Sequence, residues 1–300
     1  MIEEFEYNGK AMGTEYSIAI VCKNKELAYK MHEIGKNYIE EYESIFSRFL
    51  PNSELSILNK KKSMVVSSVF LRVTLKAYQL FNKTKGIFNP LVSISRLGYD
   101  KNFSDLDDNK NTKDDDPYDI DFSSVLIDKN KSYIQLGEGQ NLDYGGFLKG
   151  YLAEVIAEKI KSYSSDIKGV IVNIGGDIHT KGLDKNGDRF VFSIYNPILK
   201  NEDIVVTLYN QSLATSGSYK RSWFNFSKKI HHILDTSGSS NPEGDIISAS
   251  VIHKDGSFSE AYTKVFFNVE HKKALLLLEE DNLGFIIIKN NGDVIKSNTI

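Results

Sequence analysis

The sequence predicts one α+β domain over residues 1–300, made of two intimate lobes, with a largely antiparallel sheet core flanked by helices. Strand-like and helix-like apolar patterns alternate irregularly, without the β–α–β rhythm that is typical of a parallel sheet. The 300 residues are 41% hydrophobic and 26% charged, which is ordinary for a globular protein and allows a sizeable core. No internal repeat interrupts this single-domain pattern.

The N-terminal third contains one predicted strand and two predicted helices. The stretch EYSIAIVC (15–22) alternates as a strand does, and its lone cysteine, Cys22, is expected to be buried and structural. Apolar residues recur every three or four positions over 27–45, which predicts a long amphipathic helix. A second helix is predicted over 69–82, and a loop over 86–90.

An acidic stretch, residues 100–121, separates this part from the rest of the chain. It is polar and poor in apolar groups, which predicts a flexible surface excursion. A calcium loop is the alternative, but the glycine and the closing glutamate of an EF-hand are missing.

Strand patterns dominate the remaining sequence. They predict a hairpin over 124–136, strands at 169–177, 190–195, 203–209, 229–234 and 245–253, and a terminal hairpin turned at Asn291–Gly292. Helices are predicted after Gly146, from Ser257 or Ser259, and near 271–279.

Charge and hydropathy exclude two classes of function. The net charge is −3, the pI is about 6.1 and no basic stripe is present, so no nucleic-acid partner is expected. No run of about 18 apolar residues predicts a membrane span. The acidic N-terminus lacks an apolar signal core, so the chain as given is expected in the cytoplasm. Removal of an N-terminal signal would leave an exported or membrane-anchored form open.

The stretch LDYGGFLKGY (142–151) is the most suggestive local motif. Gly145 and Gly146 lie between an extended run and a helical run, where glycine lets the backbone approach a ligand closely. The free N–H groups at a helix start suit a phosphate. The spacing matches neither G-x-G-x-x-G nor the P-loop, so the motif alone does not identify the ligand.

Several such turns occur in a specific order. They are MGT (12–14), SRFLPNSELSILN (47–59), GIFNP (86–90), LDYGGFLKGY (142–151), NIGGD (173–177), TSGSY (215–219) and HILDTSG (232–238). Each is weak alone, because glycine turns are common. Together they resemble the ApbE family of flavin transferases, which move FMN from FAD onto a protein threonine. The resemblance is collinear from about residue 11 to 267 and implies an ApbE-like fold.

The resemblance implies a set of FAD contacts. They fall at Met12, Phe49, Ile87, Phe88, Asn89, Asp143, Lys149, Thr215, His232 and Ile233. Phe49 stands where the family often has tyrosine, and Asn89 replaces an aspartate. Ordinary core packing is the alternative role for the apolar members of this set.

The resemblance also implies catalytic roles for His232, Asp235 and Lys149. A histidine can act as a base near neutral pH, and an ammonium can offset the charge of a diphosphate. The alternatives are a structural histidine and a solvated lysine at a helix start.

A magnesium site is implied at the main-chain carbonyl of Gly146 and at Glu260. Glu260 replaces the family's aspartate, and Lys264 stands four residues later, where the family has a threonine ligand. A lysine ammonium has no lone pair and cannot ligate a cation. Mg²⁺ is therefore expected to bind weakly or not at all.

Two alternatives remain open for this helix. Shifting the register by one position pairs Ser259 with Thr263, but loses the carboxylate. Glu260 also fits a capping box that starts at Ser257, and it forms a favourable i,i+4 pair with Lys264.

The implied reaction is attack of a target threonine hydroxyl on the FMN phosphorus of FAD, with release of AMP. The implied partner is a flavoprotein with a D-x-x-T-[GA]-x-T acceptor segment. The alternatives are hydrolysis of FAD to FMN and AMP, and a non-catalytic FAD-binding protein.

Overall fold

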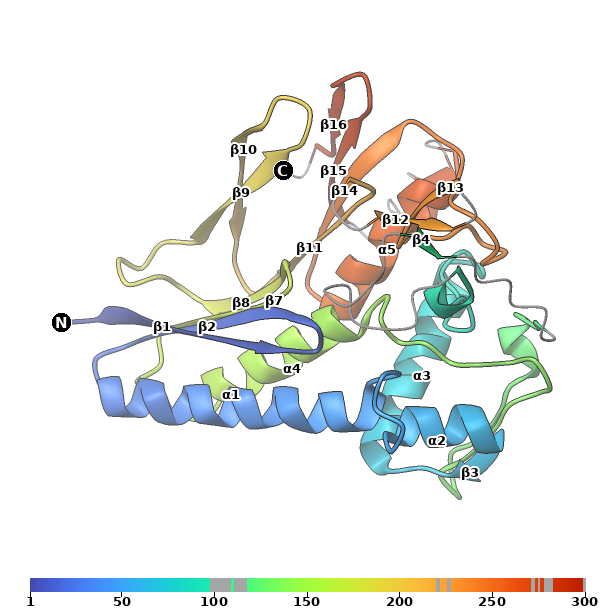
Figure 1. Cartoon of the computed structure of the whole chain (residues 1–300). Coiled ribbons are helices and arrows are strands. Elements are labelled where there is room, and N and C mark those ends of the chain that lie inside the picture. The colour runs from blue at the N-terminus through green and yellow to red at the C-terminus, as the bar shows by residue number, and fades with distance from the viewer. Residues whose placement is uncertain are drawn as a thin grey trace.

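An eight-stranded antiparallel sheet forms the centre of the molecule (Figure 1). The computed structural model describes residues 1–97, 109–110, 118–219, 222–225, 228–270, 273–274, 276–277 and 283–298. The strand order is β1 (Glu3–Ala11), β2 (Thr14–Cys22), β7 (Gly169–Ile174), β8 (Asp177–Gly182), β11 (Ser212–Gly217), β14 (Ile246–His253), β15 (Gly284–Lys289) and β16 (Val294–Lys296). Every neighbouring pair is antiparallel, as the sequence predicted.

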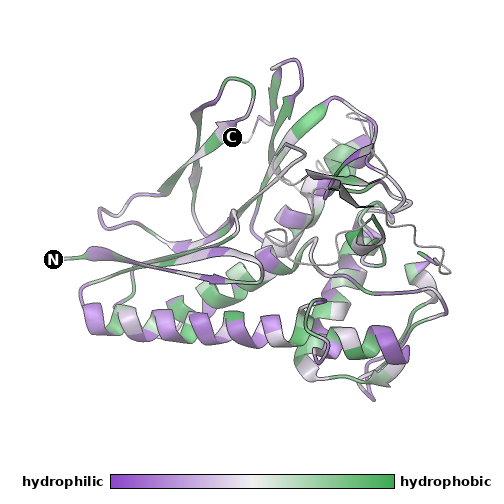
Figure 2. Cartoon of the chain, viewed as in Figure 1, coloured by the Kyte–Doolittle hydropathy of each residue, from purple (hydrophilic) through white to green (hydrophobic). Residues whose placement is uncertain are grey.

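Three helices cover one face of this sheet, as Figure 1 shows. They are α1 (Lys25–Phe46), α4 (Leu148–Lys161) and α5 (Gly256–Asn268). Two more, α2 (Glu54–Lys61) and α3 (Ser68–Lys83), extend this layer beyond the sheet. Hydrophilic and hydrophobic bands alternate along α1 in Figure 2, because its apolar residues recur at helical spacing toward the core. No helix in the described ranges is both long and apolar enough to cross a membrane.

The opposite face of the sheet carries a separate hairpin of β9 (Phe190–Asn196) and β10 (Asn201–Leu208). Its inward side chains form a second apolar cluster with residues of β11, β14 and β15. One smaller sheet contains, in order, β13 (Lys228–His231), β12 (Ser222–Asn225) and β4 (Asn109–Lys110). Another contains β3 (Ser63–Val65), β6 (Tyr133–Gln135) and β5 (Leu126–Asp128).

Most elements predicted from periodicity are confirmed. The strand at 15–22, the helices at 27–45 and 69–82, the hairpin at 124–136 and the terminal hairpin all form. Cys22 is fully buried. The acidic stretch 100–121 and the helix expected near 271–279 lie largely outside the described residues.

Two predicted boundaries were wrong. The strand expected over 229–234 ends at His231, because the chain turns there. The predicted start of α5 at Ser257 or Ser259 is also wrong. Asp255 caps the helix instead, and its carboxylate accepts from the N–H groups of Ser257 (3.0 Å) and Phe258 (3.2 Å).

Candidate functional site

The Gly145–Gly146 turn is held in place by Asp143. One carboxylate oxygen of Asp143 accepts from the Gly145 N–H at 2.9 Å. The other accepts from Arg48 Nη1 at 3.0 Å and from Ser93 Oγ at 2.9 Å. The turn is therefore held by the ion pair between Asp143 and Arg48, a residue from a distant part of the chain.

Two glycines, one in this turn and one in the first turn of α4, make close approaches that leave no room for a Cβ. A Cβ at Gly146 would lie 2.9 Å from Cε2 of Phe88, so the Phe88 ring covers the turn. A Cβ at Gly150 would meet the carbonyl oxygen of Gly256 far inside van der Waals contact, and its carbonyl carbon at 2.9 Å. Helices α4 and α5 therefore cross with their backbones nearly touching at this glycine pair.

A cluster of four charged side chains lies at this crossing. Lys149 Nζ is 3.0 Å from Asp177 Oδ2 and also contacts Glu260 Oε1. Glu260 Oε2 accepts from the Gly150 N–H at 2.9 Å, so this carboxylate caps the start of α4. Lys264 Nζ lies 3.6 Å from Glu260 Oε1 and donates to the Glu260 carbonyl oxygen at 2.9 Å. We call Lys149, Asp177, Glu260 and Lys264 the charged cluster.

The charged cluster shifts the acidity of its members. Burial and the nearby Glu260 carboxylate raise the pKa of Asp177 to about 6. Burial also acts to raise the pKa of Glu260, but Lys149, Lys264 and the Gly150 N–H outweigh it and hold this pKa below its ordinary value. Both carboxylates are therefore ionised near neutral pH, balanced by the two lysines.

The segment that carries His232 is connected to the helix of Glu260 and Lys264 by a hydrogen bond. Asn268 Nδ2, near the end of α5, donates to the carbonyl oxygen of Leu234 at 3.0 Å. Asp235 directs its carboxylate to its own loop and accepts from Ser237 Oγ and Ser240 Oγ, both at 2.8 Å. Partial burial opposes these bonds, but they outweigh it and lower the pKa of Asp235. The carboxylate therefore organises the loop that follows His232.

Two predicted FAD-contact residues form hydrogen bonds that shape their own segments. Met12 is in the left-handed region (φ 54°), and its N–H donates to Glu43 Oε1 at 2.7 Å. Asn89 donates through Nδ2 to the Ile120 carbonyl at 2.8 Å and accepts from the Leu91 N–H at 3.0 Å.

Three further predicted residues lie in apolar surroundings. Ile87 is half-buried against the main core, and Ile233 is buried within it. The Phe49 ring lies 4.7 Å from the Arg48 guanidinium and packs with Trp223 and Ile230. Phe49 therefore links the Arg48–Asp143 ion pair to the strand that leads into His232.

Thr215 is directed away from α5, the helix that carries Glu260 and Lys264 of the charged cluster. Its Oγ1 lies 2.8 Å from Ser250 Oγ. The next residue, Ser216, lies 2.6 Å from Thr263 of α5 through its hydroxyl. Since successive strand residues point to opposite faces, Thr215 points away from α5.

Sequence reasoning missed Arg48, Ser93 and Asp177 as site residues. Arg48 and Asp177 lie inside motifs that were recognised, SRFLPNSELSILN and NIGGD. The sequence signal for Asp177 is an acid directly after a Gly-Gly turn at the end of an apolar strand. The structure shows that this acid is buried, where an isolated carboxylate would be costly.

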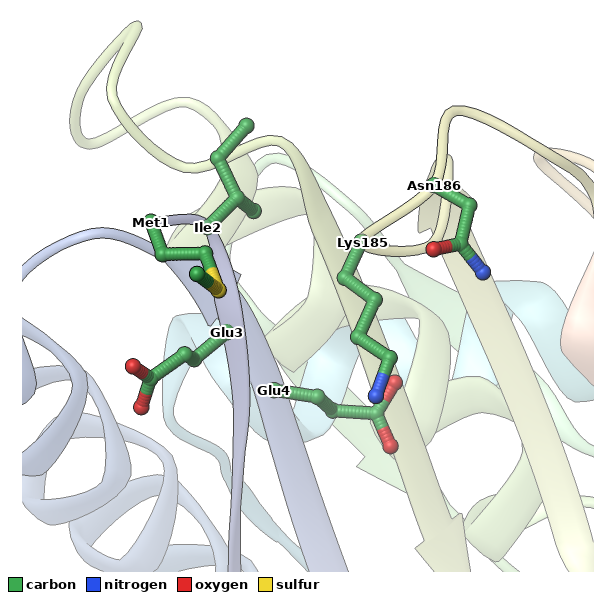
Figure 3. Close-up of a pocket in the computed structure, with 6 residues that line it drawn as sticks. All are labelled: Met1, Ile2, Glu3, Glu4, Lys185 and Asn186. Carbon is green, nitrogen blue, oxygen red and sulfur yellow. The ribbon is translucent and has the colours of Figure 1, made fainter.

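Two surface hollows lie apart from the charged cluster. One, of about 560 Å³, is lined by Met1, Ile2, Glu3, Glu4, Lys185 and Asn186, and in it Lys185 points toward Glu4 (Figure 3). The other, of about 480 Å³, lies beside the end of α5, with His231, Ser218 and Asn268 in its wall. The second hollow adjoins the segment that carries His232, whereas the first adjoins none of the predicted site residues.

Comparison with known proteins gives one consistent family. The profile of the ApbE family matches residues 12–287. The chain is 25% identical to the FAD:protein FMN transferase of Buchnera aphidicola subsp. Schizaphis graminum, over 96% of this chain and 87% of that protein. It is 26% identical to the FAD:protein FMN transferase of Treponema pallidum, over 91% and 83%.

Solved structures share the fold. The ApbE protein of Thermotoga maritima superposes with a TM-score of 0.85 at 21% identity, covering 99% of this chain and 98% of that one. The flavin transferase ApbE of Vibrio cholerae gives a TM-score of 0.79 at 20% identity, with 100% and 98% covered. The predicted α+β architecture is thereby confirmed.

Proposed function

Because the chain belongs to the ApbE family, we propose that it is an FAD:protein FMN transferase, which moves FMN from FAD to a threonine of a target flavoprotein. The observation that carries this proposal is the convergence of distant motifs on the start of α4. Arg48 and Asp143 fix the Gly145–Gly146 turn, and Phe88 covers it. The names of the similar proteins support the same reaction.

The reaction forms one P–O bond and breaks another, and it moves one proton. The oxygen of the acceptor threonine attacks the phosphorus of the FMN half of FAD, the bridging P–O bond breaks, and AMP leaves with that oxygen. The hydroxyl proton passes to a base on the enzyme. Such chemistry depends mainly on positioning and on charge stabilisation around the phosphoryl group.

We assign charge stabilisation to Lys149 and proton acceptance to His232. Lys149 lies in the first turn of α4, where the N–H groups and the helix dipole also favour an anion. An imidazole accepts a proton near neutral pH. Asp235 acts through its loop, which it holds by hydrogen bonds from Ser237 and Ser240, and so positions the segment of His232.

The flavin and the rest of FAD are assigned to the surrounding segments. The proposed contacts are Met12, Phe49, Ile87, Phe88, Asn89, Asp143, Thr215 and Ile233. Thr215 fits this set least, because its hydroxyl is directed to Ser250 on the other face of the sheet. For Asp143 and Asn89, the proposal adds FAD contact to the turn-holding bonds described above.

No step is assigned to a divalent metal. Mg²⁺ prefers six oxygen ligands in near-ideal octahedral geometry. The two oxygens of Glu260 already accept from Lys149 and from Gly150. Lys264, one helical turn later, places an ammonium beside the same carboxylate. Among the described residues, no three histidine, cysteine, aspartate or glutamate side chains are grouped to hold a metal ion. The residues at this site therefore do not fit the metal that the family resemblance implies.

The test uses FAD and a peptide that carries D-x-x-T-[GA]-x-T, with a second peptide in which valine replaces the acceptor threonine. Intact mass should show one FMN added to the first peptide and none to the second. Free FMN and AMP with unmodified peptide would instead indicate an FAD pyrophosphatase. Saturable FAD binding without either product would indicate a non-catalytic FAD-binding protein.

A further inference from the structure

The charged cluster is electrically balanced without any bound ion. Asp177 and Glu260 supply two negative charges, and Lys149 and Lys264 supply two positive charges. The Asp177 and Glu260 side chains are only 7% and 2% exposed. Because buried carboxylates require compensation, removal of either lysine would leave one negative charge unbalanced at the start of α4.

Both the side chain and the main chain of Lys264 form hydrogen bonds within the protein. Its ammonium donates to the Glu260 carbonyl oxygen at 2.9 Å and lies 3.6 Å from Glu260 Oε1. The Lys264 carbonyl accepts from Asn268 Nδ2 at 3.0 Å, and the same amide group donates to the carbonyl of Leu234, two residues after His232. The Lys264 side chain as a whole is 21% exposed, whereas that of Glu260 is 2% exposed.

We propose that the Lys264 ammonium is the resident cation of this site and occupies the role of a divalent metal, so that Glu260 binds no Mg²⁺. A Mg²⁺ ion at Glu260 would have to share the carboxylate with Lys149 and Gly150, which already donate to its two oxygens. It would also lie beside two ammonium groups, which repel it. Lys264 instead stabilises the negative charge of the FAD diphosphate directly. This role of Lys264 rests on the proposed function.

The alternative is that Lys264 serves only the stability of α5. Glu260 and Lys264 are four residues apart, a spacing at which such pairs stabilise helices in general. A purely helical role predicts that loss of the ammonium lowers stability but leaves FMN transfer by the folded protein unchanged.

The first measurement is calorimetric titration of the parent protein with MgCl₂. We expect no saturable heat at millimolar Mg²⁺, and no change in melting temperature. Saturable binding that disappears in Glu260→Gln would overturn the proposal. This readout does not depend on activity, so a protein that transfers no FMN at all would refute the proposed function while the titration still decides the metal question.

The second measurement is FMN transfer with and without a chelator, in the parent and in Lys264→Met, which removes the charge and supplies no oxygen ligand. The parent should retain its rate in chelator. Lys264→Met should lose about tenfold or more, the effect of one charge-assisted contact, without rescue by Mg²⁺. Full activity of folded Lys264→Met in chelator, or loss of parent activity in chelator, would overturn the proposal.

Two further variants complete the design. Lys181→Met removes the lysine of another Lys–Glu pair, with Glu158 of α4, and should behave as the parent does. The double variant Glu260→Asp, Lys264→Thr exchanges the ammonium for an oxygen ligand, and its transfer should require Mg²⁺. If this double variant transferred FMN as fast as the parent in chelator, the cation would be dispensable and the proposal wrong.

Discussion

The crossing of α4 and α5 at Gly150 and Gly256 predicts an unusual effect of a Gly150→Ala substitution. Alanine normally stabilises a helix by about 1 kcal/mol relative to glycine. Here the added Cβ would meet the Gly256 carbonyl oxygen far inside 3.0 Å, which real Cβ atoms essentially never show, and would lie 3.2 Å from Glu260 Cβ. The obstacle is backbone, so the two helices must separate.

Two costs add up when the helices separate. Overpacking of this kind costs about 1–3 kcal/mol. The hydrogen bond from the Gly150 N–H to Glu260 Oε2, now 2.9 Å, also lengthens, and a bond to a charged group contributes about 1.5–3 kcal/mol. After the helix-propensity gain is subtracted, we expect Gly150→Ala to lower the free energy of unfolding by about 1.5–5 kcal/mol.

Urea denaturation followed by far-UV circular dichroism measures this change. Gly244→Ala is the matched control, because a Cβ there meets nothing within 4 Å and Gly244 has no positive φ. This control should match the parent or gain about 0.4–1 kcal/mol. A Gly150→Ala protein as stable as the parent would refute the close helix crossing and, with it, the capping of α4 by Glu260.

Three other predictions test other parts of the structure. Asp255→Ala should lower stability by about 1–2 kcal/mol in thermal melts, because it removes the cap of α5 and the ion pair with Lys76. Burial lowers the pKa of His179 to about 4, so the native state resists protonation of this imidazole. The contribution of neutral His179 to the free energy of unfolding is therefore fully present above about pH 6.5 and falls as the pH drops toward 4. Between pH 8 and pH 5 the parent should lose about 2 kcal/mol more than His179→Gln; equal losses would contradict this. Lys149→Ala should raise the Kd for FAD about tenfold, and more than Lys264→Ala does, because Lys149 contacts both Asp177 and Glu260 and its loss leaves one negative charge unbalanced at the start of α4. An unchanged Kd in fluorescence titration would assign Lys149 a structural role.

Local patterns were sufficient to predict most of the fold. Each pattern indicates that one side of an element is buried, in the helix over 27–45 and in the strand at 15–22. This burial determines the structure of both elements. The strand β1 was missed because EEFEYNGKA is largely charged and polar, as suits an edge strand with one half-buried face. Helix α2 was missed because only Leu55 and Leu58 of its eight residues are buried.

The candidate site could be located from sequence, but its contacts could not. Glycine turns indicated the start of α4, because a positive φ or a close approach restricts the residue type. The partners of Lys149 lie 28 and 111 residues away, at Asp177 and Glu260, and only the tertiary structure brings them together. The sequence indicated a metal-ligand role for Glu260, with a capping box at the start of α5 as the alternative, whereas its carboxylate caps α4, a helix distant in the chain.

The most direct test of the central proposal counts both products in one reaction. The protein is incubated with FAD and the acceptor peptide, and samples are analysed over time for AMP, free FMN and FMN-modified peptide. An FMN transferase predicts that AMP and modified peptide rise together in equal amounts, with FMN mapped to the threonine by tandem mass spectrometry. AMP that rises with an equal amount of free FMN, while the peptide stays unmodified, would contradict it.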